Sequence, residues 1–263
     1  MKVAVTGSSG LIGTALMASL RSDGHQVIRL VRRPPRSDDE VRWDPRAADA
    51  GLASASDALE GLGACVHLAG AGVASHRWTS RYKAEVRASR VLGTRALAGA
   101  LARLGSPPAT LVAASAIGWY GDTGGQEVDE SAPAGPAFLS RLVRDWEAAA
   151  SPAADAGIRV VHIRSGLVLS PRGGFLARLL PLARFGLCPR FSSGRQVMSW
   201  ISLSDEIGAI RFLIDRDDLT GPVNLTAPAG HQRRVHRGAD RRRWRPRPPL
   251  AAGTGPSAAP RGR

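Results

Sequence analysis

Residues 2–13 read KVAVTGSSGLIG, a short apolar run that enters the pattern Gly-x-x-Gly-x-x-Gly. Between a buried strand and a helix, Gly7 permits a tight turn, Gly10 lets the backbone approach a pyrophosphate, and Gly13 lets the helix pack closely. The N-terminus of such a helix offers free N–H groups and a partial positive charge to an anion. The stretch therefore predicts a strand, a dinucleotide-binding loop and a helix, and a purely structural glycine turn is the alternative.

The sequence up to residue 165 alternates short apolar runs with segments of helical spacing. The predicted strands are 2–6, 26–31, 64–68, 110–114 and 159–163, and the predicted helices are 11–22, 82–103 and 136–156. This alternation indicates parallel βαβ units, so we expect an α/β fold with a doubly wound parallel Rossmann sheet. We expect a cofactor-binding domain over residues 1–165. The shorter elements that follow predict a small substrate-binding lobe over residues 166–229, interleaved with the last strands of the sheet.

Two arginines follow the second predicted strand. Val31 ends that strand and Arg32 and Arg33 come next, about 20 residues past the glycines, where an acidic residue would hold a ribose 2′-hydroxyl. Guanidinium groups suit a 2′-phosphate and offer no acceptor for a hydroxyl. The pair therefore predicts NADP(H) rather than NAD(H). The alternative is that an arginine-rich sequence places arginine on any solvated loop.

The net charge of +14 is concentrated at the end of the chain. Residues 230–263 contain ten arginines and one aspartate, whereas residues 1–229 are only mildly basic. This tail has no apolar periodicity, so we expect it to be disordered, and we expect no specific nucleic-acid partner. Its abrupt change in composition is typical of an out-of-frame reading of GC-rich coding sequence. We hypothesise a frameshift product, with a natural disordered tail as the alternative.

The remaining composition excludes other classes of protein. Cys65 and Cys188 lie far apart and without a second Cys or His at metal-ligand spacing, so no metal site is predicted. No run of about 18 apolar residues occurs that would span a membrane. We therefore expect a cytoplasmic protein without a membrane partner.

Short motifs follow the glycine loop along the chain. They are Trp43-Asp44-Pro45, His67 to Gly72, Arg77-Trp78-Thr79, Ser115 to Gly121, Asp145-Trp146-Glu147, Arg164 to Leu169, Ser199-Trp200-Ile201 and Gly221 to Leu225. Together these motifs resemble the atypical short-chain dehydrogenase/reductase family, close to its extended, epimerase-type members. The resemblance covers about residues 1–228.

The glycine loop, the arginine pair and the resemblance together give the predicted cofactor contacts. They are Gly7, Ser9, Gly10, Leu11, Ile12, Gly13, Val31, Arg32, Arg33, Leu68, Ala69, Gly70, Glu85, Arg90 and Val168. Of these, Glu85 and Arg90 would be ordinary charges on an exposed helix if the family pattern did not apply. Trp78 and Trp146 are expected to pack as core anchors rather than to contact a substrate.

The proton chemistry of the family is missing from this chain. Typical members carry Tyr-x-x-x-Lys, in which the Lys ammonium lowers the tyrosine pKa so that the phenol exchanges a proton as hydride moves. By the resemblance, those positions hold Leu139 and Val143. The remaining candidates are Ser115, which would hydrogen-bond a substrate carbonyl, and Tyr120, which would donate a proton or contact the substrate. A serine that satisfies nearby backbone and a packed tyrosine are the structural alternative.

Two functions are compatible with these residues. The first is an NADP(H)-dependent oxidoreductase or epimerase acting on a small polar substrate, which could carry a nucleotide. The second is an NADP(H)-binding regulatory protein without turnover, which the loss of the Tyr-Lys pair favours. Because helix-pair dimers are common in the family, a homodimer is compatible with either function.

Overall fold

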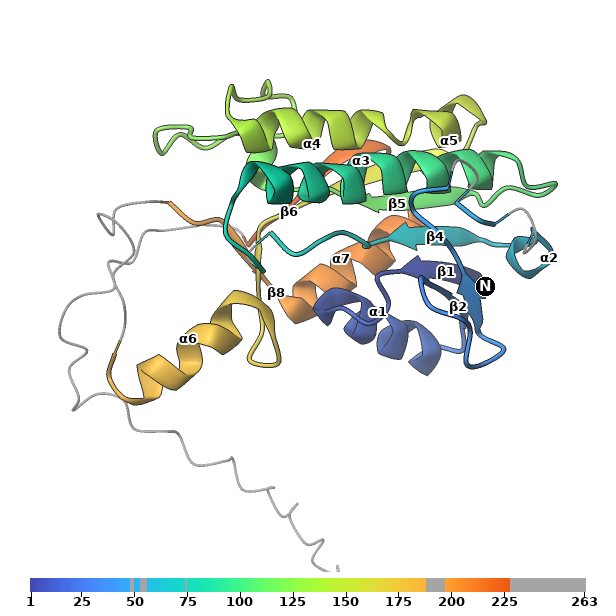
Figure 1. Cartoon of the computed structure of the whole chain (residues 1–263), viewed down its shortest axis with the longest axis horizontal. Coiled ribbons are helices and arrows are strands. Elements are labelled where there is room, and N and C mark those ends of the chain that lie inside the picture. The colour runs from blue at the N-terminus through green and yellow to red at the C-terminus, as the bar shows by residue number, and fades with distance from the viewer. Residues whose placement is uncertain (48–49, 53–55, 74, 188–196, 228–263) are drawn as a thin grey trace, which may run out of the picture.

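The computed structural model describes residues 1–47, 50–52, 56–73, 75–187 and 197–227 of the chain (Figure 1). Within these ranges the centre is a seven-stranded sheet in the order β3-β2-β1-β4-β5-β6-β9, with every neighbouring pair parallel. Its strands are β1 (Lys2–Thr6), β2 (Gln26–Val31), β3 (Glu40–Arg42), β4 (Ala64–His67), β5 (Thr110–Ala114), β6 (Arg159–Ser165) and β9 (Gly221–Leu225). The winding reverses between β1 and β4, which is where open α/β sheets bind ligands. The predicted doubly wound Rossmann sheet is confirmed.

Helices cover both faces of the sheet. Figure 1 shows α3 (Ser80–Ala102), α4 (Phe138–Ala148) and α5 (Ser151–Asp155) on one face, and α1 (Leu11–Ser22) and α7 (Leu203–Asp215) on the other. Because successive side chains of a strand point to opposite faces, β1 contributes to both cores. Val3 and Val5 pack in the α1 and α7 core, whereas Ala4 packs in the α3 core. Burial on both faces explains why the strands are continuous apolar runs.

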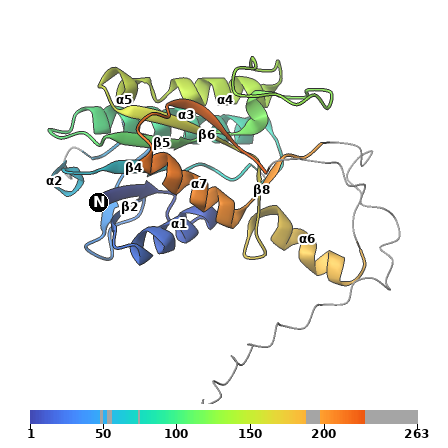
Figure 2. The same ribbon diagram turned by 180° about the vertical axis from the view of Figure 1, so that it is seen from behind.

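A small second region lies beyond the sheet. It contains α6 (Gly174–Arg184) and the parallel pair β7 (Leu167–Leu169) and β8 (Trp200–Ser202). Seen from behind in Figure 2, α6 extends away from the main layers. None of the residues of α6 is fully buried. The start of α6 nevertheless lies beside the glycine loop. A Cβ at Gly173, which caps α6, would lie 3.2 Å from the side chain of Leu11.

One predicted helix is wrong, because the structure has two helices where the sequence pattern predicts one. The segment 136–156 forms two helices, because Pro152 stands in the first turn of α5. In a continuous helix the proline ring would clash with the carbonyl of Ala148 and leave it without its hydrogen bond. The sequence pattern did not indicate β3 and β7, which are only three residues long each. It also did not indicate the short helices α2 (Ser56–Leu59) and η2 (Ile117–Trp119).

The domain boundary at residue 165 stays a prediction. In the structure, α7 packs against α1 and β9 pairs with β6, so both belong to the layers of the main sheet. The predicted disordered tail 230–263 lies outside the described residues. Within the described part of the chain, no helix combines the length and the apolar composition needed to cross a membrane.

Candidate functional site

The glycine loop, residues 7–13, passes directly against the end of β4. Gly7 has φ +67°, and a Cβ there would lie 2.8 Å from the carbonyl carbon of Leu68. A Cβ at Gly13 would lie 2.3 Å from the carbonyl oxygen of Gly7. Since heavy atoms cannot approach this closely, both positions exclude every side chain. The packing therefore requires glycine at the first and third positions of the motif.

The N-terminus of α1 presents unpaired N–H groups. Gly10 caps the helix without a side-chain hydrogen bond, and the first turn contains no acidic residue. The backbone N–H groups of Leu11, Ile12 and Gly13 take no acceptor from the described residues, whereas that of Thr14 bonds Gly10. These donors and the positive end of the helix dipole suit an anion such as a phosphate.

A cavity of about 270 Å³ opens beside these groups. It gathers residues from the loop after β1, from α1, from the residue that follows β4, and from β7 and α6. Its lining consists of Gly7, Gly10, Leu11, Ile12, Gly13, Leu68, Leu167, Val168, Gly174 and Phe175. Seven predicted cofactor contacts therefore line one cavity: Gly7, Gly10, Leu11, Ile12, Gly13, Leu68 and Val168. Ser9 lies exposed at the tip of the loop, and Ala69 and Gly70 continue from Leu68 along the chain.

Thr6 and His67 fix the ends of β1 and β4 at the point where the winding reverses. The Oγ1 atom of Thr6 accepts the N–H groups of Leu68 (3.0 Å) and Ala69 (3.2 Å). Its own proton is then directed to Nδ1 of His67 at 2.7 Å. Burial lowers the pKa of His67 to about 4, so the imidazole is neutral near pH 7. This pair is structural and holds Leu68 beside the glycine loop.

The arginine pair after β2 divides into a free and a fixed side chain. Arg32 is exposed and has no hydrogen bond or ion pair with another described residue. Arg33 binds the buried carboxylate of Glu40 through both Nη atoms, at 2.7 and 2.6 Å. Glu40 also pairs with Arg29 and accepts the N–H of Arg36. The hydrogen bond from Arg33 is the main cause that lowers the pKa of Glu40 to about 2.

Arg90 and Glu85 lie on α3 and differ in exposure. Arg90 is half-buried: its Nη1 donates to the carbonyl of Ala71 at 2.9 Å, and its guanidinium lies 5.0 Å from the ring of Trp146. A Cβ at Gly70 would meet the guanidinium carbon at 3.4 Å. Burial lowers the pKa of Arg90. Glu85 is exposed. Arg90 therefore packs against the loop 69–71 and hydrogen-bonds its backbone, which an ordinary exposed charge would not do.

Ser115 follows β5 and belongs to a buried polar network. Its Oγ donates to Oε1 of Glu147 at 2.5 Å. Arg164, on β6 and with only 2% of its side chain exposed, binds the same carboxylate at 2.8 and 2.9 Å. Although burial alone would lower it, hydrogen bonds to Glu147 and Tyr120 raise the pKa of Arg164. The guanidinium and the carboxyl group of Glu147 therefore hydrogen-bond each other through both carboxyl oxygens, as buried polar groups require.

Tyr120 is part of the same network. Its hydroxyl donates to Oδ1 of Asn224 at 2.7 Å and accepts Nη1 of Arg164 at 3.0 Å. We call Ser115, Tyr120, Glu147, Arg164 and Asn224 the Ser115 network. The hydroxyls of Ser115 and Tyr120 both have partners, which is the arrangement of a satisfied structural cluster. Sequence reasoning missed Glu147 and Arg164 as site residues; an arginine inside an apolar strand was the available signal.

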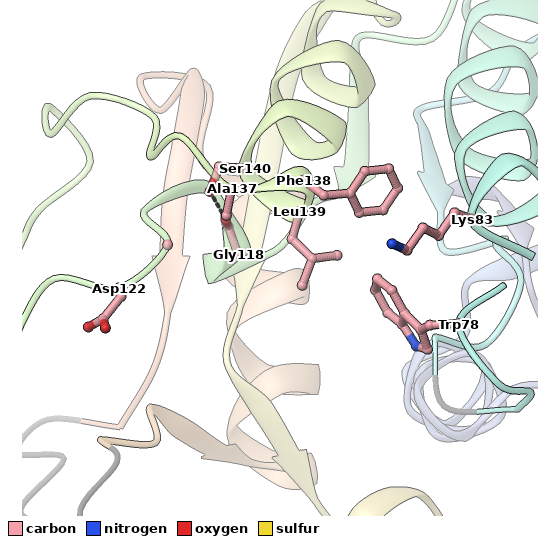
Figure 3. Close-up of a pocket in the computed structure, with 9 residues that line it drawn as sticks. Trp78, Lys83, Gly118, Asp122, Ala137, Phe138, Leu139 and Ser140 are labelled. Atoms are coloured by element: carbon pink, nitrogen blue, oxygen red, sulfur yellow. Dashed lines mark hydrogen bonds between the residues drawn. The ribbon is translucent and has the colours of Figure 1, made fainter. Parts of the chain in front are cut away.

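A second cavity of about 420 Å³, the Leu139 cleft, lies between η2, the start of α4 and the start of α3 (Figure 3). It is lined by Trp78, Lys83, Gly118, Gly121, Asp122, Ala137, Phe138, Leu139 and Ser140. Both Leu139 and Val143 face η2, because a Cβ at Gly118 would lie within 3.8 Å of each. Val143 is buried and Leu139 is 39% exposed into the cleft. Neither side chain transfers a proton.

Trp78 corrects an expectation. Trp146 is buried as a core anchor, but Trp78 is 41% exposed. Its indole N–H donates to the carbonyl of Val73 at 2.8 Å, and its ring meets the edge of Phe138 at 6.0 Å between centroids. A polar partner and an aromatic neighbour hold the indole at the wall of the Leu139 cleft rather than in the core. Throughout the described ranges, no cluster of three or more His, Cys, Asp or Glu is placed to hold a metal.

Comparisons with known proteins agree with this geometry. A family model described as the NAD dependent epimerase/dehydratase family matches residues 3–225. "Epimerase family protein Mb2239" of Mycobacterium bovis is 48% identical over 227 residues, which cover 86% of this chain and 73% of that protein.

Two solved structures are similar over most of this chain. Human epimerase family protein SDR39U1 (isoform 2) with NADPH has a TM-score of 0.77 at 34% identity, covering 88% of this chain and 75% of that one. The nucleoside-diphosphate sugar epimerase from Corynebacterium glutamicum has a TM-score of 0.75 at 39% identity and covers 87% of this chain. The chain spans only 47% of the length of that second protein.

Proposed function

The chain belongs to the NAD dependent epimerase/dehydratase family, and we propose that it binds NADP(H) and acts as an oxidoreductase or epimerase on a small polar substrate. The observation that carries this proposal is the cavity at the glycine loop. There, three backbone N–H groups at the N-terminus of α1 have no acceptor among the described residues. A dinucleotide pyrophosphate has the charge and the acceptors that these groups lack.

The arginines after β2 support NADP(H) over NAD(H). Arg32 is exposed and free to bind a 2′-phosphate, whereas Arg33 is held in place by the carboxylate of Glu40. Glu40, the buried carboxylate of β3, is already bound by Arg29 and Arg33, so it is not free to accept a ribose hydroxyl. The NADPH named for the human structure agrees with this assignment.

When bound, the nicotinamide would supply or accept the hydride. Of the chain's own residues, Ser115 is the polar side chain at the end of β5, and its proton points to Glu147. Its oxygen lone pairs are therefore left to accept a hydrogen bond from a substrate hydroxyl. This favours a serine that positions an alcohol over one that donates to a carbonyl, because the carboxylate holds the proton.

A second candidate function is an NADP(H)-binding protein without turnover. It is favoured by Leu139 and Val143, which stand where the family carries its proton-transferring pair, and by the hydroxyl of Tyr120, which is occupied by Asn224 and Arg164. In that function, occupancy of the cofactor site would regulate an interaction of the protein.

Tritium transfer separates the two functions. The purified protein is incubated with [4-³H]NADPH and panels of aldehydes, ketones and keto-sugar nucleotides, and label is sought in the alcohols that form when the hydride and a proton add to the carbonyl group. The proposed enzyme transfers label to at least one class, and a Ser115→Ala variant transfers less. Tight NADPH binding with no transfer to any class contradicts the enzyme and supports the regulatory protein.

A further inference from the structure

The Leu139 cleft has an apolar wall built from two helices. Leu139 and Phe138 start α4, and Trp78 precedes α3. The phenyl and indole rings meet edge to face, at 84° between their planes. Leu139 and Trp78 are among the larger apolar side chains that remain exposed, so they gather on one surface that would gain from an apolar partner.

Lys83 places a single cation in this apolar setting. Figure 3 shows its ammonium directed toward Leu139, between the rings of Phe138 and Trp78. The nitrogen lies 5.4 Å from the centroid of Phe138, and no described residue forms an ion pair with it. Lys83 is one of only two lysines in the chain, which otherwise uses arginine for its basic residues.

The position of Lys83 on its helix is unfavourable without an anion. Thr79 caps α3 through the N–H of Tyr82, so that Lys83 lies at the end of the first turn. Cations near a helix N-terminus are disfavoured by the dipole, and the first turn of α3 contains no acidic residue. The nearest acidic residue of the cleft, Asp122, accepts the N–H of Gly124 and points away from the ammonium in Figure 3.

The polar groups of the cleft offer little to a sugar. The hydroxyl of Ser140 already donates to the carbonyl of Gly118 at 2.9 Å. Apart from Lys83 and from Asp122, whose carboxylate accepts the N–H of Gly124, the remaining walls are glycine, alanine, leucine and aromatic side chains. Sugar hydroxyls buried there would lose their hydrogen bonds with water and gain few in return.

We propose that the Leu139 cleft binds a small carboxylate with an apolar body, with Lys83 paired to the carboxylate and the body against Trp78 and Leu139. This inference rests on the proposed function, since it names the class of substrate for the same site. The cleft, at about 420 Å³, has the volume and the mostly apolar lining of a small-molecule site.

Calorimetric titration with 4-phenylbutyrate tests the proposal, with the neutral 4-phenylbutyramide and UDP-glucose as comparison ligands. The full chain is used at saturating NADPH, as wild type and as Lys83→Gln, Lys83→Arg and Arg81→Gln. Arg81 is exposed on the same turn and does not line the cleft, so its variant is the matched control for charge. We expect Lys83→Gln to weaken carboxylate binding about tenfold, and Lys83→Arg and Arg81→Gln to stay within about threefold of wild type.

Four results would overturn the proposal: no binding of 4-phenylbutyrate to wild type, equal binding to wild type and Lys83→Gln, equal binding of the amide, or displacement by lower concentrations of UDP-glucose. NADPH fluorescence and thermal unfolding are recorded on the same samples. Failure of wild type to bind NADPH contradicts the proposed function, whereas intact NADPH binding with any of the four results contradicts only the carboxylate.

Discussion

The glycine loop and the Ser115 network stand at the same edge of the sheet, and their polar groups are satisfied in opposite ways. At the glycine loop, the N–H groups of residues 11–13 have no acceptor among the described residues, and the packing forbids any side chain that would fill the space. In the Ser115 network, every hydroxyl, the carboxylate and the guanidinium bind one another. The contrast teaches that the side proposed to bind the cofactor keeps unpaired donors for a ligand, while the polar groups on the side proposed for the reaction already bind one another.

The largest expected effect is on stability and comes from disrupting the Ser115 network. Glu147→Gln leaves the guanidinium of Arg164 without its counter-charge in a site where that side chain is 2% exposed. Removing one partner of a buried pair costs about 3–5 kcal/mol, so the free energy of unfolding in urea should fall by that amount. The control is Asp145→Asn, which breaks the exposed pair with Arg87 and should cost no more than about 1 kcal/mol. Equal effects of the two variants would show that the network is not a buried unit.

The next effect depends on pH and concerns a carboxyl that is only half satisfied. Glu206 on α7 is buried, Ser165 donates to one of its oxygens at 2.6 Å, and the other oxygen has no described partner. Burial raises the pKa of Glu206 from 4.5 to about 7, so the folded protein holds the proton more tightly than the unfolded chain. Its contribution to stability is therefore present below pH 4.5 and is lost as the pH rises through 7.

Glu206→Gln removes that dependence, because the amide does not ionise. Relative to wild type, the variant should gain on the order of 3 kcal/mol between pH 4.5 and pH 8. Urea unfolding at both pH values measures the difference. A stability difference between variant and wild type that is the same at both pH values would mean that Glu206 does not titrate in this range.

A side chain placed in the glycine loop should weaken cofactor binding strongly. Gly13→Ala places a methyl group 2.3 Å from the carbonyl oxygen of Gly7, which must shift the loop. We expect NADPH affinity, measured by nicotinamide fluorescence, to fall about 100-fold, or about 2.7 kcal/mol. Gly208→Ala on α7 is the control, because a Cβ there meets nothing within 4 Å. Unchanged NADPH affinity in a folded Gly13→Ala protein would remove the glycine loop from the cofactor site.

The smallest effect separates the two arginines after β2. Arg32→Asp removes the free guanidinium and should lower NADPH affinity about tenfold, with little change for NADH. Arg33→Asp should lower it as well, and should also destabilise the fold, because Arg33 binds the buried Glu40. Parallel titrations with both cofactors test this. If Arg32→Asp weakened NADPH and NADH equally, Arg32 would not read the 2′-phosphate.

Much of this comparison could be predicted from the sequence, because the fold depends on local patterns. The glycine spacing and the continuous apolar runs gave β1, α1, β2 and β5 with the bounds that the structure has. Pro152 broke a predicted helix that its apolar spacing alone suggested was continuous. The predicted cofactor contacts among residues 7–13 lie together because they are neighbours in the chain.

The reaction side could not be predicted in the same way, because its contacts join distant segments. Ser115 and Glu147 come from β5 and α4, Arg164 from β6, and Asn224 from β9. No spacing in the sequence encodes these partners. The exposed position of Trp78 could not be predicted either. Its ring packs against Phe138, which lies on α4, and no local pattern in the sequence indicates that contact.

The central claim is that the glycine loop and the arginines form a working NADP(H) site beside a reaction centre without the Tyr-Lys pair. Titration of the wild-type protein with NADPH and with NADH, followed by nicotinamide fluorescence, tests it most directly. The account predicts saturable binding of NADPH at an affinity at least about tenfold above that of NADH. Absence of binding, or equal affinity for the two cofactors, would contradict it.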